Sequence, residues 1–174
     1  TGKSTLQESI PVVEIGKGSI KILAWSQMHG NESTTTKAVF DLLNAFAELK
    51  DENKVVGSIL RNCTIRIIPM LNPDGAKAYT RANANKVDLN RDAQNLNEVE
   101  SRLLREEFNV FQPNYCLILQ DQRRIFSIDS DPKPATRSFL APSIDNKSSI
   151  NHNRIKAMHY SYTNLTLTTL DNAM

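Results

Sequence analysis

The fold class follows from one apolar run, Cys63-Thr64-Ile65-Arg66-Ile67-Ile68-Pro69-Met70-Leu71. Its hydrophobic residues are too continuous for a strand with one face in water, so we predict a central strand covered on both sides. Pro69 marks where strand pairing stops, because proline has no backbone N–H to donate to a neighbouring strand.

Strand-like and helix-like segments alternate around this run. We predict strands at residues 10–15, 19–25 and 115–119, the last of them buried, with a hairpin-like turn at residues 16–18. Helical spacing of apolar residues predicts helices at residues 36–49 and 98–111, and residues 151–160 resemble a third helix. The hydroxyls of Ser33 and Thr34 are candidate caps for the first helix. This alternation predicts an α/β layer fold, with ligands at the C-terminal ends of strands.

Composition narrows the class of partner. The chain has 174 residues, of which 40% are hydrophobic and 23% charged, as is typical of a globular domain with its own core. A net charge of +2 provides no global field for nucleic acid, and no apolar run approaches the roughly 20 residues of a membrane helix. We therefore expect neither nucleic acid nor membrane as a partner. The given sequence has no leader pattern, so we expect a cytoplasmic location.

Polar residues unsuited to a core follow three of the apolar strands, at residues 29–32, 72–91 and 120–123. The middle segment belongs to a long polar stretch, and loops beyond about 15 residues in a compact domain are usually functional. We expect the three segments to converge on one crevice. In the first, His29 and Glu32 are three positions apart, and an imidazole and a carboxylate are common ligands of a catalytic zinc.

Each of these residues also has a purely structural interpretation. His29 on its own is more often a satisfied or exposed histidine, and Glu32 is a carboxylate that a helix dipole favours near an N-terminus. Arg81 and Arg91 on their own are solvated loop charges, and residues 72–75 form a turn. Only the combination favours a site.

With these motifs the sequence resembles the zinc metallocarboxypeptidases of the carboxypeptidase A type. The matching residues are His29-Gly30-Asn31-Glu32, Asn72-Pro73-Asp74-Gly75, Arg81 and Val87-Asp88-Leu89-Asn90-Arg91-Asp92. Residues 25–34 and 121–123 are similar to a bacterial branch of that family. The resemblance covers nearly the whole chain. It implies a mixed, twisted α/β sheet flanked by helices, in a single, partial catalytic domain over residues 1–174.

The resemblance also implies a role for each matching residue. His29 and Glu32 correspond to the first two zinc ligands, and Arg81 to the arginine that polarises the scissile carbonyl. Asn90 and Arg91 correspond to the pair that holds the substrate's terminal carboxylate, which a guanidinium can grip through two parallel hydrogen bonds. The implied cofactor is one zinc ion. The implied substrate is a peptide or small amide with a free carboxylate, hydrolysed at its C-terminal amide bond.

The sequence departs from the family pattern at the third zinc ligand, a histidine in the family. The register of residues 121–123 places this position on Gln120, whose neutral amide is a poorer zinc ligand than imidazole or carboxylate. Asp121 should point to the opposite face of the strand. His152 or His159 could replace the missing ligand only if their helix packs over the crevice. We therefore expect low zinc occupancy.

A second departure is that no segment resembles the family's later part, which carries a glutamate general base and a substrate-covering tyrosine. The match fades after Met158, so we expect a fragment or an inactive member.

Two alternatives to a peptidase stay open. One is a non-catalytic module that keeps the carboxylate pocket without the metal. The other is an amidohydrolase of N-acyl amino acids, a class that shares the first motif, His-Gly-x-Glu. The sequence motifs at residues 72–75 and 88–91 favour the carboxypeptidase branch over this class.

Overall fold

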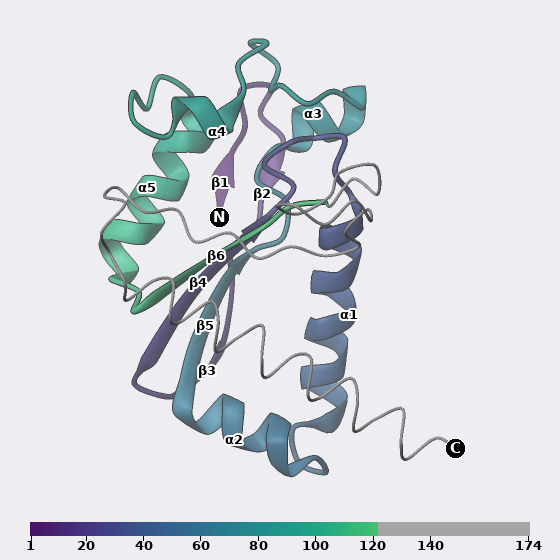
Figure 1. Ribbon diagram of the computed structural model, residues 1–174, viewed down its shortest axis with the longest axis vertical. Helices are drawn as coiled ribbons and strands as arrows, with labels where there is room; N and C mark the ends of the chain where they lie inside the picture. The colour runs from purple at the N-terminus through teal and green to yellow at the C-terminus, as the bar shows by residue number, and fades with distance from the viewer. Residues whose placement is uncertain (122–174) are drawn as a thin grey trace, which may run out of the picture. The chain divides into compact units, whose positions relative to one another are not determined.

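The central strand of the sheet is β5 (Cys63–Ile68), as the continuous apolar run predicts. The computed structural model describes residues 1–121, which form one compact unit (Figure 1). Their four-stranded sheet has the order β3-β5-β4-β6, in which β3 is antiparallel to β5 while β5, β4 and β6 are parallel. The other strands are β3 (Val13–Gly16), β4 (Ile20–Ser26) and β6 (Tyr115–Leu119). The prediction of a mixed sheet in an α/β fold is therefore confirmed.

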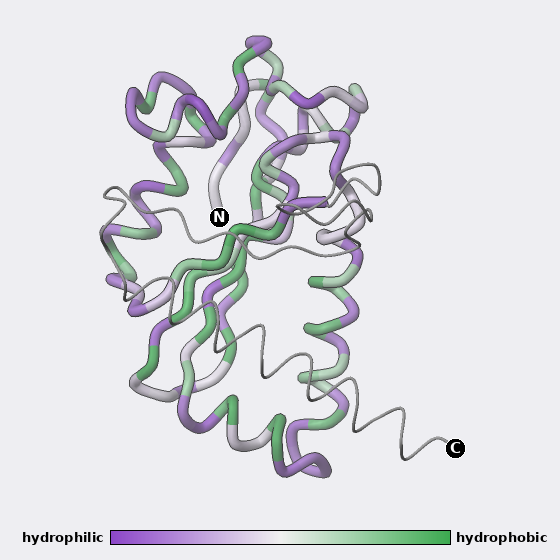
Figure 2. The backbone as a smooth tube through the Cα atoms, viewed as in Figure 1, coloured by the Kyte–Doolittle hydropathy of each residue, from purple (hydrophilic) through white to green (hydrophobic). Residues whose placement is uncertain are grey.

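Helices cover both faces of this sheet, as its apolar pattern requires. Successive side chains of a strand point to opposite faces, and Ile67 and Ile68 of β5 accordingly belong to two different hydrophobic clusters. One cluster packs against α1 (Thr34–Leu49) and α2 (Lys54–Asn62), and the other against α5 (Val99–Phe111). Burying each such isoleucine contributes about 1.5–3 kcal/mol. Figure 2 shows the hydrophobic residues concentrated along the central strands.

The hairpin predicted at residues 16–18 is wrong, because β5 lies between β3 and β4. The glycines of this segment serve a close approach to the start of β5 instead. Gly16 has a φ of +81°, and a Cβ on Gly18 would lie 1.8 Å from the backbone carbon of Asn62. The Gly18 N–H donates to the Cys63 carbonyl at 3.1 Å. Ile10 belongs to a separate antiparallel pair, β1 (Gly2–Lys3) with β2 (Ser9–Ile10).

The first and last predicted helices of the described part are confirmed as α1 and α5, but α2 was not predicted. The proposed hydroxyl caps of α1 are wrong, because Ser33 makes no side-chain capping bond. Instead the carboxylate of Asp121 accepts from the backbone N–H groups of Thr34 and Thr35, at 3.3 and 3.2 Å. This contact ties the end of β6 to the start of α1.

The long polar segment contains two short helices, α3 (Pro73–Ala78) and α4 (Leu89–Asp92). Residues 72–75 are the capped start of α3 rather than an isolated turn, because the Asn72 side chain accepts from the Gly75 N–H at 2.9 Å. The buried carboxylate of Asp74 accepts from the Ser4 hydroxyl at 2.7 Å, which attaches the N-terminal segment.

Strand β6 exists as predicted, but its predicted burial is wrong. Tyr115 and Ile118 are 45% and 44% exposed, and among the strands of residues 1–121 β6 is the last in the order of the four-stranded sheet. The predicted helix at residues 151–160, with His152 and His159, lies outside the described residues, as do residues 122 and 123. Among residues 1–121, none of the helices is both long and apolar enough to cross a bilayer.

Candidate functional site

The turn that carries His29 and Glu32 is held in place by the start of α3. It follows directly on β4, and the Asn72 N–H donates to the Gln27 carbonyl at 3.1 Å. The Asn72 side chain donates to the Met28 carbonyl at 3.2 Å while it also caps α3. One asparagine therefore joins two of the predicted motifs.

The glycines of these two motifs are in backbone contact. A Cβ built on Gly30 would lie 2.0 Å from the carbonyl carbon of Gly75, and a Cβ on Gly75 would lie 2.5 Å from the Ala82 oxygen. Both distances exclude a side chain without a backbone shift. Gly30 is therefore required by the close approach of the two motifs, and Gly75 by the loop backbone at Ala82.

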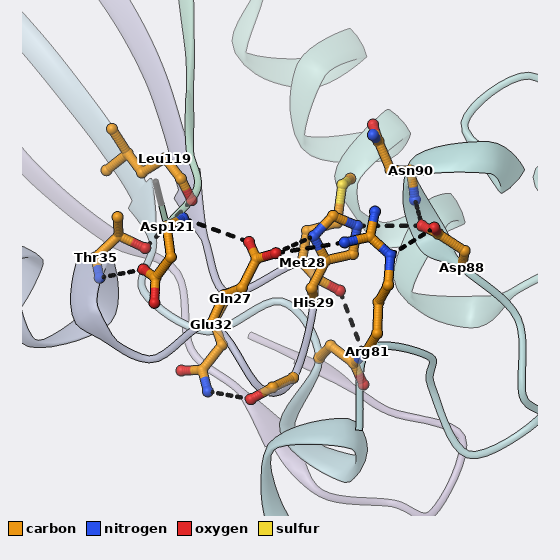
Figure 3. Close-up of polar contacts among 12 residues, drawn as sticks. Gln27, Met28, His29, Glu32, Thr35, Arg81, Asp88, Asn90, Leu119 and Asp121 are labelled. Atoms are coloured by element: carbon orange, nitrogen blue, oxygen red, sulfur yellow. Dashed lines mark hydrogen bonds and ion pairs between the residues drawn. The ribbon is translucent and has the colours of Figure 1, made fainter. Parts of the chain in front are cut away.

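His29 is completely buried and lies between two carboxylates, as Figure 3 shows. Its Nδ1 atom is 3.0 Å from Oε1 of Glu32, and its Nε2 atom is 3.2 Å from Oδ1 of Asp88. Within the described residues Nδ1 makes no hydrogen bond besides this short contact with Glu32. Of the two nitrogens only Nε2 forms a hydrogen bond, and its carboxylate partner can only accept, so we assign the proton of the neutral ring to Nε2 and the lone pair to Nδ1.

Arg81 completes the cluster from the loop after α3. Its Nε donates to Oδ2 of Asp88 at 3.0 Å, and its Nη1 lies 3.4 Å from Oε1 of Glu32. Asp88 also accepts from the Asn90 backbone N–H at 2.9 Å, as the N-cap of α4. Asp88 thereby connects the imidazole, the guanidinium and a helix start.

Both carboxylates of the cluster are ionised at neutral pH. Burial on its own would raise the pKa of Glu32, but contacts with His29, the Asp121 N–H and Arg81 lower it below its ordinary value. Burial likewise opposes ionisation of Asp88, yet the hydrogen bonds from Arg81 and from the Asn90 N–H lower its pKa. Two negative charges therefore converge around one buried imidazole, with one guanidinium to neutralise them.

The structure brings His29, Glu32 and Arg81 together, as the sequence predicts, but it does not join every predicted residue to them. Asn90 contacts the cluster through its backbone alone among the described interactions. Arg91 is exposed on α4, and within residues 1–121 its side chain forms no hydrogen bond or ion pair with the cluster. Asp88 was not predicted as a site residue, although an aspartate at a helix N-cap position was a detectable signal.

Gln120 directly follows β6, at the edge of the same cluster. The next residue, Asp121, donates its backbone N–H to Oε2 of Glu32 at 3.4 Å (Figure 3). The Asp121 carboxylate accepts from the backbone N–H groups of Thr34 and Thr35 at the start of α1. Glu32 is therefore in contact with the backbone that presents Gln120.

Two of the side chains present fit a zinc ion. Ligand atoms about 2.0–2.1 Å from a tetrahedral zinc lie roughly 3.3 Å from each other, close to the 3.0 Å between His29 Nδ1 and Glu32 Oε1. A buried nitrogen lone pair beside an ionised carboxylate also favours a cation between them. Within residues 1–121, however, no third histidine, cysteine or acid completes a metal-binding group. The described donor set therefore fits zinc in two positions and lacks a strong third ligand.

Comparison with known sequences identifies relatives. A family model described as zinc carboxypeptidase matches residues 1–117. Gamma-D-glutamyl-L-diamino acid endopeptidase 1 of Lysinibacillus sphaericus is 33% identical over 79 residues, which cover 42% of this chain and 20% of that protein. Carboxypeptidase SOL1 of Arabidopsis thaliana is 37% identical over 65 residues, covering 37% of this chain and 13% of that protein. The matched segments thus span at most a fifth of these relatives.

Solved structures share the fold. A metallo-carboxypeptidase from Burkholderia cenocepacia superposes with a TM-score of 0.63 at 20% identity, over 69% of this chain and 35% of that one. A metallo-carboxypeptidase from Pseudomonas aeruginosa superposes with a TM-score of 0.61 at 21% identity, over 69% and 33%. Together with the family match over residues 1–117, these findings show that the chain belongs to the zinc carboxypeptidase family.

Proposed function

We propose that this chain is part of a carboxypeptidase-type hydrolase that acts on the C-terminal amide bond of peptides. The observation that carries the proposal is the cluster in which the unpartnered Nδ1 of His29 lies 3.0 Å from Glu32, with Arg81 beside both. Such a cluster joins a metal-ligand pair to a cation that can stabilise negative charge on an oxygen.

His29 and Glu32 are the residues that would hold zinc. When bound, zinc acts as a Lewis acid and lowers the pKa of its water to about 7. Asp88 accepts from Nε2 of His29, which fixes the ring orientation and leaves Nδ1 free as a ligand. The protein thus supplies both the ligand atoms and their orientation.

Arg81 is placed to stabilise the oxygen of a cleaved amide. Asp88 holds its Nε and Glu32 lies 3.4 Å from its Nη1, so the guanidinium keeps a defined orientation beside the proposed metal ligands. A positioned charge-assisted donor of this kind favours an oxyanion over a neutral carbonyl. Arg91 is exposed and free of the cluster in the described residues, so it is available for a substrate carboxylate.

A second candidate is a carboxylate-binding module without catalytic metal. It is favoured by the amide at position 120 and by the absence of a third strong ligand from residues 1–121.

A third candidate is an amidase of N-acyl amino acids. The name of the Lysinibacillus relative describes cleavage beside a diamino acid, so N-acylated amino acids and short γ-glutamyl peptides belong in the substrate panel.

Three assays on the full chain separate these functions. Zinc content after purification distinguishes an enzyme, with bound metal, from a metal-free module. Hydrolysis of peptides with free and amidated C-termini then tests the carboxylate grip. We expect Arg91→Ala to raise KM for free C-termini alone, with Arg61→Ala on α2 as the matched control. An equal effect on amidated peptides, or turnover restricted to N-acyl amino acids, contradicts the peptidase proposal.

A further inference from the structure

We propose that Gln27 is a positioning residue whose buried amide sets the directions of the two metal-binding side chains. The inference rests on the proposed function, because it assigns His29 and Glu32 as the pair to be oriented. Gln27 is only 3% exposed and lies immediately after β4, before the turn that carries both ligands.

The Gln27 amide forms a bridge across the base of the turn. Its Nε2 donates to the Gly30 carbonyl at 2.7 Å, and its Oε1 accepts from the Thr36 hydroxyl at 2.7 Å. Gly30 lies between His29 and Glu32 in sequence, whereas Thr36 belongs to α1. The bridge therefore fixes the middle of the ligand turn relative to a rigid helix.

The backbone of Gln27 is itself in an uncommon conformation. Its φ is +47°, in the left-handed region that residues other than glycine rarely adopt. Its carbonyl accepts from the Asn72 N–H at 3.1 Å, so the conformation is held from outside the turn as well. Strained backbone of this kind persists where the surroundings over-determine it, and it is concentrated at functional sites.

An amide is the side chain that can perform both contacts. It donates through its nitrogen and accepts through its oxygen at the same time, which neither an ionised carboxylate nor a thioether can do. Gln27→Met keeps the length and removes both bonds. Gln27→Glu keeps the acceptor for Thr36 and places an oxygen against the Gly30 carbonyl. Each variant therefore releases the ligand turn by a different route.

Ser26→Ala is the matched control, because it disrupts the same buried network without touching the turn. The Ser26 hydroxyl contacts the Thr36 hydroxyl at 3.0 Å and donates to the Pro69 carbonyl, and it makes no hydrogen bond to residues 28–32 within the described part of the chain. Both Ser26→Ala and Gln27→Met lose buried hydrogen bonds, so urea denaturation should show that both lower the free energy of unfolding. A purely structural role for Gln27 predicts no other difference between the two variants.

The deciding measurement is the long-range ¹H–¹⁵N spectrum of the His29 ring in the metal-free full chain, assigned with His29→Gln. We expect wild type and Ser26→Ala to show the single tautomer with the proton on Nε2. Gln27→Met and Gln27→Glu should shift the ring signals and mix the tautomers, because the ring loses its fixed approach to Asp88. Unchanged ring signals in a folded Gln27 variant, or an equal change in Ser26→Ala, would overturn the proposal.

Zinc competition against a chelator provides a second readout. We expect Gln27→Met to weaken zinc binding by about tenfold or more, as loss of an orienting group typically does, and Ser26→Ala to leave it unchanged. If His29→Ala binds zinc as wild type does, the proposed function fails, but the ring spectra still decide the role of Gln27. The two failures are therefore distinguishable.

Discussion

The Nε2 atom of His29 lies 3.2 Å from Oδ1 of Asp88, whose other oxygen accepts from Arg81. One carboxylate thus orients both the imidazole that would bind metal and the guanidinium that would stabilise an oxyanion. We predict that Asp88→Asn weakens zinc binding by about 10–100-fold, because the ring loses its charged acceptor. The measurement is competition with a chromophoric chelator. Unchanged affinity, or the same loss in the surface control Asp41→Asn, contradicts the orienting role.

Gly30→Ala should lower the free energy of unfolding by about 1–3 kcal/mol, since its methyl group meets the Gly75 backbone and a shift is needed to admit it. Gly57→Ala on α2 is the control, because its added Cβ would meet the flexible end of the Arg61 side chain at 3.1 Å and the Lys50 carbonyl oxygen at 3.2 Å, well beyond the 2.0 Å at Gly30. Helix propensity also favours alanine there. Urea denaturation compares the two variants, and an equal effect of both argues against the backbone contact.

Asp92 should stabilise the protein in a pH-dependent way. Its buried carboxylate accepts from the backbone N–H groups of Asn97 and Glu98 at 3.0 and 2.9 Å. Burial on its own would raise the pKa of Asp92, but these hydrogen bonds outweigh it and lower the pKa below its ordinary value. Because the folded-state pKa is the lower one, the stabilisation is present above the unfolded value of about 3.9 and is lost as the pH falls through the folded value.

Asp92→Asn is accordingly expected to cost about 1–3 kcal/mol near pH 7 and progressively less in acid. Denaturation curves at neutral pH and near pH 3 measure the difference, with Asp51→Asn as the surface control. A difference that is the same at both pH values means that the charge of Asp92 does not contribute.

The sequence predicts the parts of this fold that depend on local pattern. The run at residues 63–71 has apolar side chains for both faces of a strand, and β5 is indeed covered on both. The order of pairing depends on distant contacts, so the short spacing of β3 and β4 wrongly indicated a hairpin. The cap of α1 was also unpredictable, because Asp121 lies 87 residues beyond Thr34. Helix α2 was missed because it is short and contains Gly57.

The sequence was sufficient to predict which residues belong to the site, but not the contacts that these residues make with one another. The family motifs identify His29, Glu32 and Arg81, and in the structure Glu32 contacts both of the other two. Asp88 contacts His29 from 59 residues further along the chain, so only its N-cap position was a local signal. The proposed role of Gln27 depends on the direction of its side-chain amide, which no sequence pattern reveals. The roles of Asn90, Arg91 and Gln120 stay predictions.

The most direct test of the whole account is zinc binding by the full chain with and without Gln120→His. The described scaffold holds the two proposed ligands, His29 and Glu32, and anchors the backbone beside position 120 through the contact between Asp121 and Glu32. We predict weak zinc binding in wild type and about one tightly bound zinc per chain in Gln120→His. Adding His29→Ala to Gln120→His should abolish this binding. The control Gln112→His, at the end of α5, should bind no more zinc than wild type. If Gln120→His gains no zinc, or keeps it without His29, the assignment of this metal site is wrong.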